Sequence, residues 1–540
     1  MTQISWFLVM LVGLSIAGCG GLIGADASLS STSSSGESTT SSSSPEALAG
    51  LTSFSVNSDN DAVVQLDNID TSSNYILALY SYNTSNSSYS LSVTSPDVSS
   101  TVTTSALTLS NNDSDDETEN AHALLRDMEA DLDGDVVSVP ATRMKAVTTA
   151  LTVGSTRTFK VLQSFSSTTS YQTVTATLEY VSSNFYVYID NRDLMSDADM
   201  VTLSEKLADF DAVVATERTL FGEESDVNGD GHFAILMTQG VNELAASQGA
   251  GVIVSGFYFG GDLYSASSTP SSNEMEVLYS LVPDPTGAHG TVVSTSFAFS
   301  NFIPSLLPHE FQHMISYNQH VLINHGSAET SFLGEAMSHL AEDIYSTEDG
   351  YMTSSGIENP SRMALYLNST SSVCFICGSS ITQRGGSYSF IRYLYEQAEK
   401  GNLAGASSGA ELISRLLDTN LTGTSNFLNA ATGSTDAAGF SSLMAHFSAA
   451  LYLSGLDLVS DDHYTLDGID LRGKQSDNRG TTLSGPSVTE VSTLPYNLTL
   501  VSAGVTYLQI SGQSLEDVNG LVSVHFPSGM QGGGAIIQMN

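Results

Sequence analysis

Positively charged side chains are scarce in this sequence, and their scarcity excludes some partners. The 540 residues contain 16 Lys and Arg against 58 Asp and Glu, a formal net charge of −42. Proteins bind nucleic acids and anionic membrane surfaces mainly through Lys and Arg, so we expect neither partner. The bases are also unevenly placed: none precedes Arg126, none occurs in residues 219–361, and none follows Arg479.

Cysteine is scarce too, with three in the whole chain. Cys374 and Cys377 are separated by only two residues, and a zinc ribbon would need a second such pair. In an exported protein a pair this close favours a local disulfide, which we predict here.

Long apolar runs are lacking except at the N-terminus. Trp6–Ala17 is apolar but too short to span a bilayer stably, which is typical of an export signal. The end of this signal, Ile16-Ala17-Gly18-Cys19, resembles the lipobox of bacterial lipoproteins, although no Lys or Arg precedes it. We therefore predict a signal peptide over 1–18 and lipidation of Cys19. An ordinary secretory signal with a chance cysteine is the alternative.

A Ser/Thr-rich tract follows the signal. Of the 17 residues Ser28–Ser44, 14 are Ser or Thr, a composition that builds no core and is typical of a flexible tether. We predict a lipidated tether over 19–49. It would hold the protein on the cell envelope, facing outside the cytoplasm and on the outer membrane if the cell has one; the alternative is a secreted protein.

The remaining chain has enough apolar residues for substantial cores, since hydrophobic residues make up 41% of the sequence. Short alternating runs predict a small antiparallel β domain over 50–110. Mixed helical and strand patterns cover 111–470, and short strands return over 471–540. Within the mixed region the patterns predict a helix over 201–220 and strands over 233–237 and 252–257. The sequence therefore predicts an α+β protein flanked by small β domains.

The segment His309-Glu310-Phe311-Gln312-His313 has the pattern H-E-x-x-H. Ser305 and Pro308 suit the start of a helix, and residues i and i+4 share one helix face. Both imidazoles could then bind one zinc ion, while Glu310 acts as general base on a water molecule. The alternative is a pair of polar residues on a solvated helix face.

Catalytic zinc usually has three protein ligands, so a third is needed. Glu335 follows His313 by 22 residues in a second helical pattern, and a helix returning over the metal could supply it. His325 and Glu329 in the connecting loop, and Glu342 on the same helix, are the competitors. We favour Glu335 because helices hold ligand geometry better than loops do.

Several segments together resemble the gluzincin metallopeptidases, most closely the hyicolysin family, over roughly residues 120–450. The resemblance implies a thermolysin-like zincin domain in which His309, His313 and Glu335 bind zinc and Glu310 is the general base. The similar segments are His309–Met314, Gly334–Asp343, Asp226–Gly231, Gly256–Phe259, Ser272–Tyr279 and Gly386–Leu394.

One residue departs from the thermolysin-like pattern. That pattern has an Asp four residues after the third ligand, where this chain has His339. A histidine cannot orient a ligand imidazole as a carboxylate does, but Glu342 could take that role. For an oxyanion donor, Tyr388 and His463 are candidates, and we favour neither.

An acidic turn offers a second metal site. Asp226, Asn228 and Asp230 have the 1-3-5 spacing of a calcium loop, but Met237 stands where an EF-hand needs Glu. A shortened calcium turn and a metal-free Asx turn remain, and we favour calcium.

The base-free segment 219–361 holds every candidate metal ligand. One hypothesis is a strongly negative cleft that favours substrates with basic or neutral side chains. The alternative is adaptation of the whole surface to a saline medium.

These observations predict a zinc-dependent endopeptidase that hydrolyses extracytoplasmic proteins or peptides. The alternative is a surface binding or adhesion lipoprotein whose zinc site is structural or inactive.

Overall fold

A computed structural model describes most of the chain from residue 47 onward. The chain divides into two compact units, Met1–Ser44 and Pro45–Asn540, and every described residue belongs to the second. The predicted signal peptide 1–18, Cys19 and nearly all of the predicted tether lie outside the described residues. No helix in the described part of the chain is both long and apolar enough to cross a membrane. The described residues are 47–48, 51–55, 61–95, 106–107, 117–132, 136, 151–193, 195–249, 251–345, 358–475 and 480–539.

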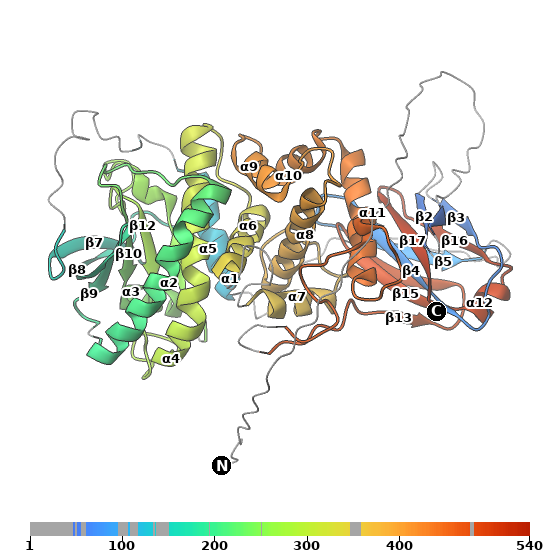
Figure 1. The fold of residues 1–540 in the computed structure, drawn as a ribbon, viewed down its shortest axis with the longest axis horizontal. Helices are drawn as coiled ribbons and strands as arrows, with labels where there is room; N and C mark the ends of the chain where they lie inside the picture. Colours follow the sequence, from blue (N-terminus) through green and yellow to red (C-terminus); the bar gives the residue numbers. More distant parts are fainter. Residues whose placement is uncertain are drawn as a thin grey trace, which may run out of the picture. The chain divides into compact units, whose positions relative to one another are not determined.

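Residues 156–280, which lie in the middle part of the sequence, include a mixed six-stranded sheet, called the central sheet below (Figure 1). Strands β9, β10 and β12 run parallel, and β11 pairs antiparallel with β12 at one edge. The predicted strand over 233–237 is confirmed and is buried along its whole length, as continuous apolar runs in parallel strands require. The strands, in sheet order, are β11 Gly256–Tyr258, β12 Val277–Ser280, β10 Phe233–Met237, β9 Phe185–Asp190, β8 Tyr171–Val181 and β7 Thr156–Leu162.

Two long helices pack on this sheet through aromatic rings. The Phe210 ring of α2 (Asp197–Phe221) lies 5.5 Å from that of Phe185, and the Phe311 ring of α5 (Ile303–Tyr317) stacks at 4.8 Å on Phe233. The sheet therefore fixes the position of α5, the helix with the H-E-x-x-H pattern. The short helices α3 (Gln239–Ala246) and α4 (Thr295–Phe297) complete this part of the fold.

Helix α5 begins earlier than the sequence suggests. Helical turns start at Thr295 behind the side chain of Ser294, which accepts a hydrogen bond from the N–H of Phe297. The prediction that Ser305 caps this helix is wrong, because Ser305 lies inside it and donates its hydroxyl to Glu342. Every residue of α5 is buried, so tertiary contacts rather than the local cap decide where it starts.

The helices that follow α5 build the rest of the central region. Helix α6 contacts both α5 and α8, and α7 packs on α8. The predicted disulfide between Cys374 and Cys377 is present just before α8. These helices are α6 Ser331–Tyr345, α7 Asn359–Leu367, α8 Ile381–Glu399, α9 Gly409–Leu417, α10 Gly423–Thr432 and α11 Ala437–Leu453.

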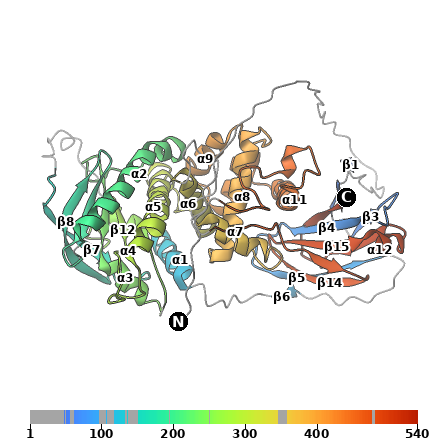
Figure 2. The same cartoon turned by 60° about the horizontal axis from the view of Figure 1, so that its bottom comes forward.

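Strands from both ends of the described chain share two further sheets (Figure 2). One has the order β1-β2-β17-β4-β15-β13 and the other the order β14-β5-β16-β3, with β6 paired to β5. The expectation of separate β domains over 50–110 and 471–540 is therefore wrong. The strands are β1 Ala47–Leu48, β2 Leu51–Ser55, β3 Asp61–Gln65, β4 Asn74–Ser81, β5 Ser88–Thr94, β6 Ala106–Leu107, β13 Thr489–Val491, β14 Tyr496–Val501, β15 Val505–Ser511, β16 Leu521–His525 and β17 Gly532–Met539, with α12 Gly512–Glu516 between β15 and β16.

The core of this β unit explains why the two ends combine. Leu77 and Leu91 from the N-terminal strands are buried in one apolar cluster with Leu508 and Val524 from the C-terminal strands. Each end supplies strands to both sheets, but neither end supplies a complete sheet, so the apolar faces of one end are buried only together with those of the other. The described chain is thus a mixed α+β protein, as predicted, with one composite β unit.

Candidate metal centre

Two histidines of α5 lie one helical turn apart on the same face. The rings of His309 and His313 are 4.9 Å apart between centroids, and both side chains are buried. This is the arrangement that the spacing predicts, because residues i and i+4 lie one above the other on a helix.

Glu335 of α6 reaches both histidines. Its Oε2 lies 3.2 Å from Nε2 of His309, and its Oε1 lies 3.6 Å from Nε2 of His313. The side chain is fully buried, because α6 packs directly against α5. The ligand atoms of the three residues all lie within 4.8 Å of one another, so this buried group could bind a metal ion.

The competing third ligands lie elsewhere. Glu329 is 3.8 Å from His320, and His325 belongs to no potential metal-binding group among the described residues. Glu342 does contact His309, but at the opposite ring nitrogen, Nδ1.

Several atoms of this group lack hydrogen bonds. Among the described residues, neither His313 Nε2 nor either Glu335 oxygen has a hydrogen bond of good geometry. Arg384 Nη1 does lie 2.5 Å from Glu335 Oε2 as an ion pair. Buried polar atoms are normally hydrogen-bonded, so lone-pair atoms that lack a hydrogen-bond partner and converge on one point fit a metal ion.

The protonation states of Glu335 and His313 also suit metal binding. Burial alone would raise the pKa of Glu335, but Arg384 and the two histidines outweigh it and hold the pKa well below its usual value. Burial lowers the pKa of His313 to about 3, with Arg126 adding to the effect. An ionised carboxylate and a neutral imidazole are the forms that bind metals.

His309 differs because it has two carboxylate partners. Burial would lower its pKa, but the close contacts with the carboxylates of Glu335 and Glu342 outweigh burial and raise the pKa to about 9. A metal ion bound at Nε2 would displace a proton from this ring, so metal binding here should release a proton.

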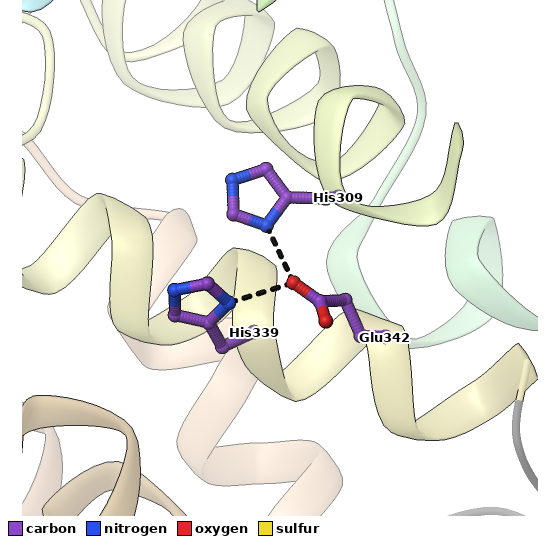
Figure 3. Close-up of side chains that lie close together, drawn as sticks. All are labelled: His309, His339 and Glu342. Atoms are coloured by element: carbon purple, nitrogen blue, oxygen red, sulfur yellow. Dashed lines mark hydrogen bonds and ion pairs between the residues drawn. The ribbon is translucent and has the colours of Figure 1, made fainter. Parts of the chain in front are cut away.

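One carboxylate oxygen of Glu342 contacts the rings of both His309 and His339 (Figure 3). This oxygen, Oε1, accepts from Nδ1 of His309 at 2.9 Å and from Nδ1 of His339 at 2.7 Å. The other oxygen, Oε2, accepts from Ser305 at 2.9 Å and lies 3.3 Å from Arg362 Nη1. Because an ionised carboxylate can only accept, Nδ1 of His309 carries the proton and Nε2 faces Glu335.

His309, His339 and Glu342 form a second group close enough to bind a metal ion, but their distances favour hydrogen bonds. Two N or O ligands of one tetrahedral zinc ion lie roughly 3.3 Å apart, given metal–ligand distances near 2.0–2.1 Å. The contacts of Glu342 at 2.7 and 2.9 Å are shorter than that, whereas those of Glu335 at 3.2 and 3.6 Å bracket it. Glu342 therefore orients His309, and Glu335 shares the metal-binding point.

Glu310 lies next to this point and is held by the sheet. Its Oε2 accepts a hydrogen bond of 2.8 Å from the backbone N–H of Tyr258 on β11. Burial raises the pKa of Glu310 to about 7, although His309 and Arg126 pull it down. A carboxyl group with a pKa near neutrality is suited to general base catalysis.

Arginines from outside the base-free segment surround these carboxylates. Arg362 of α7 and Arg384 of α8 line, with Glu310 and Glu342, a pocket of about 110 Å³ over the centre. Arg126 adds a further charge, which lowers the pKa of His313. With Glu358 also in its lining, the pocket carries charges of both signs, and the hypothesis of a strongly negative cleft stays a prediction.

Sequence reasoning missed these arginines because their partners are distant in the chain. Arg384 follows Glu335 by 49 residues, and no local pattern links the two. Arg384 does stand two residues before a segment, Gly386–Leu394, that resembles the hyicolysin family, and that position is a signal that could have drawn attention to it.

The acidic turn before β10 is satisfied by its own backbone. Asp226 Oδ1 accepts from the N–H of Gly231 at 3.2 Å, Asn228 Oδ1 from that of Asp230 at 3.0 Å, and Asp230 Oδ1 from that of His232 at 2.9 Å. These are the hydrogen bonds of an Asx-type turn. Calcium at this turn stays a prediction.

The two candidate oxyanion donors have other partners. The Tyr388 hydroxyl donates to Asp343 Oδ2 at 3.0 Å, and His463 Nδ1 lies 2.8 Å from Asp461 Oδ1. Neither residue lines the pocket over the centre.

The geometry defines a buried His/Glu centre, held between two packed helices, that could bind a metal ion. No protein-family model matches this sequence, and no curated protein matches it either. The resemblance to the hyicolysin family therefore rests on the quoted segments alone, and a function has to be argued from the site.

Proposed function

We propose that this protein is a zinc-dependent endopeptidase that hydrolyses extracytoplasmic proteins or peptides. The observation that carries the proposal is the convergence of His309, His313 and Glu335, with Glu310 one residue after the first ligand. Two imidazoles and one carboxylate are a ligand set of catalytic zinc sites, which leave a fourth position open.

The chemistry divides between the ion and the chain. Zinc bound here would supply Lewis acidity, which polarises a peptide carbonyl and favours ionisation of water. Glu310 removes the proton from the attacking water molecule and later delivers it to the leaving amine. The N–H of Tyr258 orients the Glu310 carboxylate for both transfers.

The position of β11 favours a peptide substrate. β11 is an edge strand of the central sheet, so its outer backbone groups can pair with an extended chain. Tyr258 belongs to this edge and contacts Glu310, so a peptide paired there would pass the general base. The antiparallel edge strand, the motif helix α5 and the returning helix α6 together support a thermolysin-like zincin fold.

The location of the protein follows from the sequence. The lipobox-like segment ending at Cys19 and the Ser/Thr-rich tract support a lipid-anchored protein of the cell envelope. The peptidase would then act on proteins outside the cytoplasm.

Zinc analysis paired with a casein-cleavage assay tests this function. We expect the full-length protein to bind one zinc ion and to show cleavage that a chelator abolishes. Glu310→Gln should retain zinc and lose at least about 10³-fold in kcat, because the general base is gone. Zinc bound stoichiometrically without cleavage of any protein or peptide would sink the proposal and favour a binding or adhesion lipoprotein.

A further inference from the structure

The outer edge of β11 is covered by an N-terminal helix, α1 (Glu117–Ala130). Arg126 Nη2 donates a hydrogen bond of 2.7 Å to the carbonyl of Tyr258, and Glu129 Oε1 accepts one of 2.5 Å from the N–H of Gly260. Antiparallel pairing uses alternate residues, so the backbone groups of Tyr258 face away from β12. An extended peptide joining this edge would need the same groups.

These contacts are built into a buried interface. Arg126 is 9% exposed and Glu129 is 3% exposed, and the two form an ion pair of 2.7 Å. Leu125, the residue before Arg126 on the helix, is fully buried in the central core. A buried ion pair tolerates desolvation only when further hydrogen bonds satisfy it, and here the backbone of the edge strand region supplies them.

Helix α1 also narrows the space over the metal centre. His122 lines the pocket together with His309, Glu310 and Arg384, and that pocket measures about 110 Å³. Small-molecule sites usually measure roughly 300–1,000 Å³, and a protein substrate needs an open groove. With α1 in place, the site is too small for an extended peptide.

We propose that α1 is an inhibitory helix that occupies the substrate's place along β11. Its partner is the cleft of the same chain: the Arg126 guanidinium takes the position of a substrate N–H, and the Glu129 carboxylate that of a substrate carbonyl. Substrate binds only after α1 has left the edge. This inference rests on the proposed peptidase function and adds its regulation.

Binding of a small zinc ligand tests the inference without turnover. The tripeptide hydroxamate Pro-Leu-Gly-NHOH would be titrated calorimetrically into zinc-loaded full-length protein and into the variant Arg126→Ala/Glu129→Ala. We expect at least about tenfold tighter binding to the variant, because the unmodified protein is binding-competent only in the fraction of molecules that α1 has left. Cleavage of a fluorogenic peptide should rise in parallel.

Asp127→Asn is the matched control, because Asp127 lies on the exposed side of the same helix. It should leave hydroxamate affinity and peptide cleavage unchanged. Equal hydroxamate affinity in all three proteins, each with stoichiometric zinc, would overturn the inference.

Hydrogen exchange in the unmodified protein gives a second test, which does not depend on whether a variant folds correctly. Saturating hydroxamate should speed exchange of the α1 amides, since the helix has to leave; unchanged or slower exchange would count against the inference. The two proposals fail differently. Tighter hydroxamate binding without any peptide cleavage would support α1 as a cover and refute the peptidase.

Discussion

Glu342 shows how one buried carboxylate can fix the geometry of a candidate metal ligand, His309. It holds Nδ1 of His309 and of His339 with one oxygen and faces Arg362 with the other. Burial would raise its pKa, but Arg362 and His339 outweigh it and hold the pKa well below the usual value. The residue is therefore ionised and can only accept, which fixes the tautomer of His309.

Replacing Glu342 should weaken metal binding. In Glu342→Gln the amide is uncharged, and it can no longer accept from both imidazoles and also balance Arg362. We expect zinc affinity to fall about 10–100-fold, as for other residues that orient metal ligands. Competition with a chromophoric chelator would measure it. Glu358→Gln is the control, since Glu358 also forms an ion pair with Arg362, at 3.2 Å; a similar loss there would contradict the assignment.

Glu217 of α2 is the opposite case, because it is a buried carboxyl group whose burial is not offset by hydrogen bonds among the described residues. It is fully buried, and neither of its oxygens has a hydrogen-bond partner among the described residues. Burial, with Glu224 nearby, raises its pKa well above the usual value. A raised folded-state pKa stabilises the protein below the unfolded-state pKa, and this contribution is lost as pH rises toward the folded-state pKa.

Glu217→Met should therefore stabilise the protein, and more at pH 8 than at pH 5. We expect a gain of about 1–3 kcal/mol in the free energy of unfolding at pH 8, because an unsatisfied polar group is replaced by an apolar one. Urea unfolding at both pH values measures it. Glu205→Met on the exposed side of α2 should change stability by less than about 0.5 kcal/mol. A loss of stability in Glu217→Met would show that the carboxyl group has a function.

At the scale of elements, close packing of α7 on α8 positions Arg362 and Arg384. Gly385 sits against the backbone of Arg362, and a Cβ there would collide with the carbonyl oxygen of that residue. Arg384 precedes Gly385 directly, so the contact that brings the helices together also sets the ion pair with Glu335.

Gly385→Ala should push these helices apart. We expect a loss of about 1–3 kcal/mol in the free energy of unfolding, which is typical of overpacking. Thermal or urea unfolding would detect it. Gly334→Ala is the matched control, because its Cβ would lie 3.8 Å from the nearest atom outside its own helix backbone, on His313, an ordinary contact distance. That change should be neutral or stabilising by up to about 1 kcal/mol, since alanine favours helices. Equal losses in both variants would contradict this account.

Elements with strong periodicity could be predicted from sequence. The apolar run over 233–237 is β10, and helical spacing over 201–220 lies within α2. The start of α5 could not be predicted, because buried contacts extend the helix toward the N-terminus, beyond the local start signals at Ser305 and Pro308. β11 was expected over 252–257 and occupies Gly256–Tyr258, since pairing with β12 sets its bounds.

The site residues likewise include some that the sequence predicts and some that it does not. His309, Glu310 and His313 follow from local spacing, and Glu335 from a second helical pattern. The approach of Arg384 to Glu335, and that of Arg126 to Tyr258, depends on how distant elements pack. No local pattern in one sequence encodes such contacts.

At the scale of the whole molecule, the β unit depends on both chain ends. β17 lies between β2 and β4, so a chain that stops at Pro527 lacks a strand inside the sheet. We expect the midpoint of thermal unfolding to fall by more than about 10 °C, since several kcal/mol of buried contacts are lost. A chain that starts at Pro45 should unfold at the original temperature. An unchanged midpoint after loss of β17 would contradict this view.

The order in which the chain is synthesised gives the position of α1 a further meaning. β4 ends at Ser81 and its neighbour β15 starts at Val505. The N-terminal strands therefore lack their C-terminal pairing strands during most of the chain's synthesis. At about 5–20 residues per second, this period lasts some tens of seconds. Helix α1, by contrast, is made before both β11 and α5. If α1 is inhibitory as proposed, the helix would already be present when β11 and α5 first form the site, and a newly made chain would not expose an open site to other proteins.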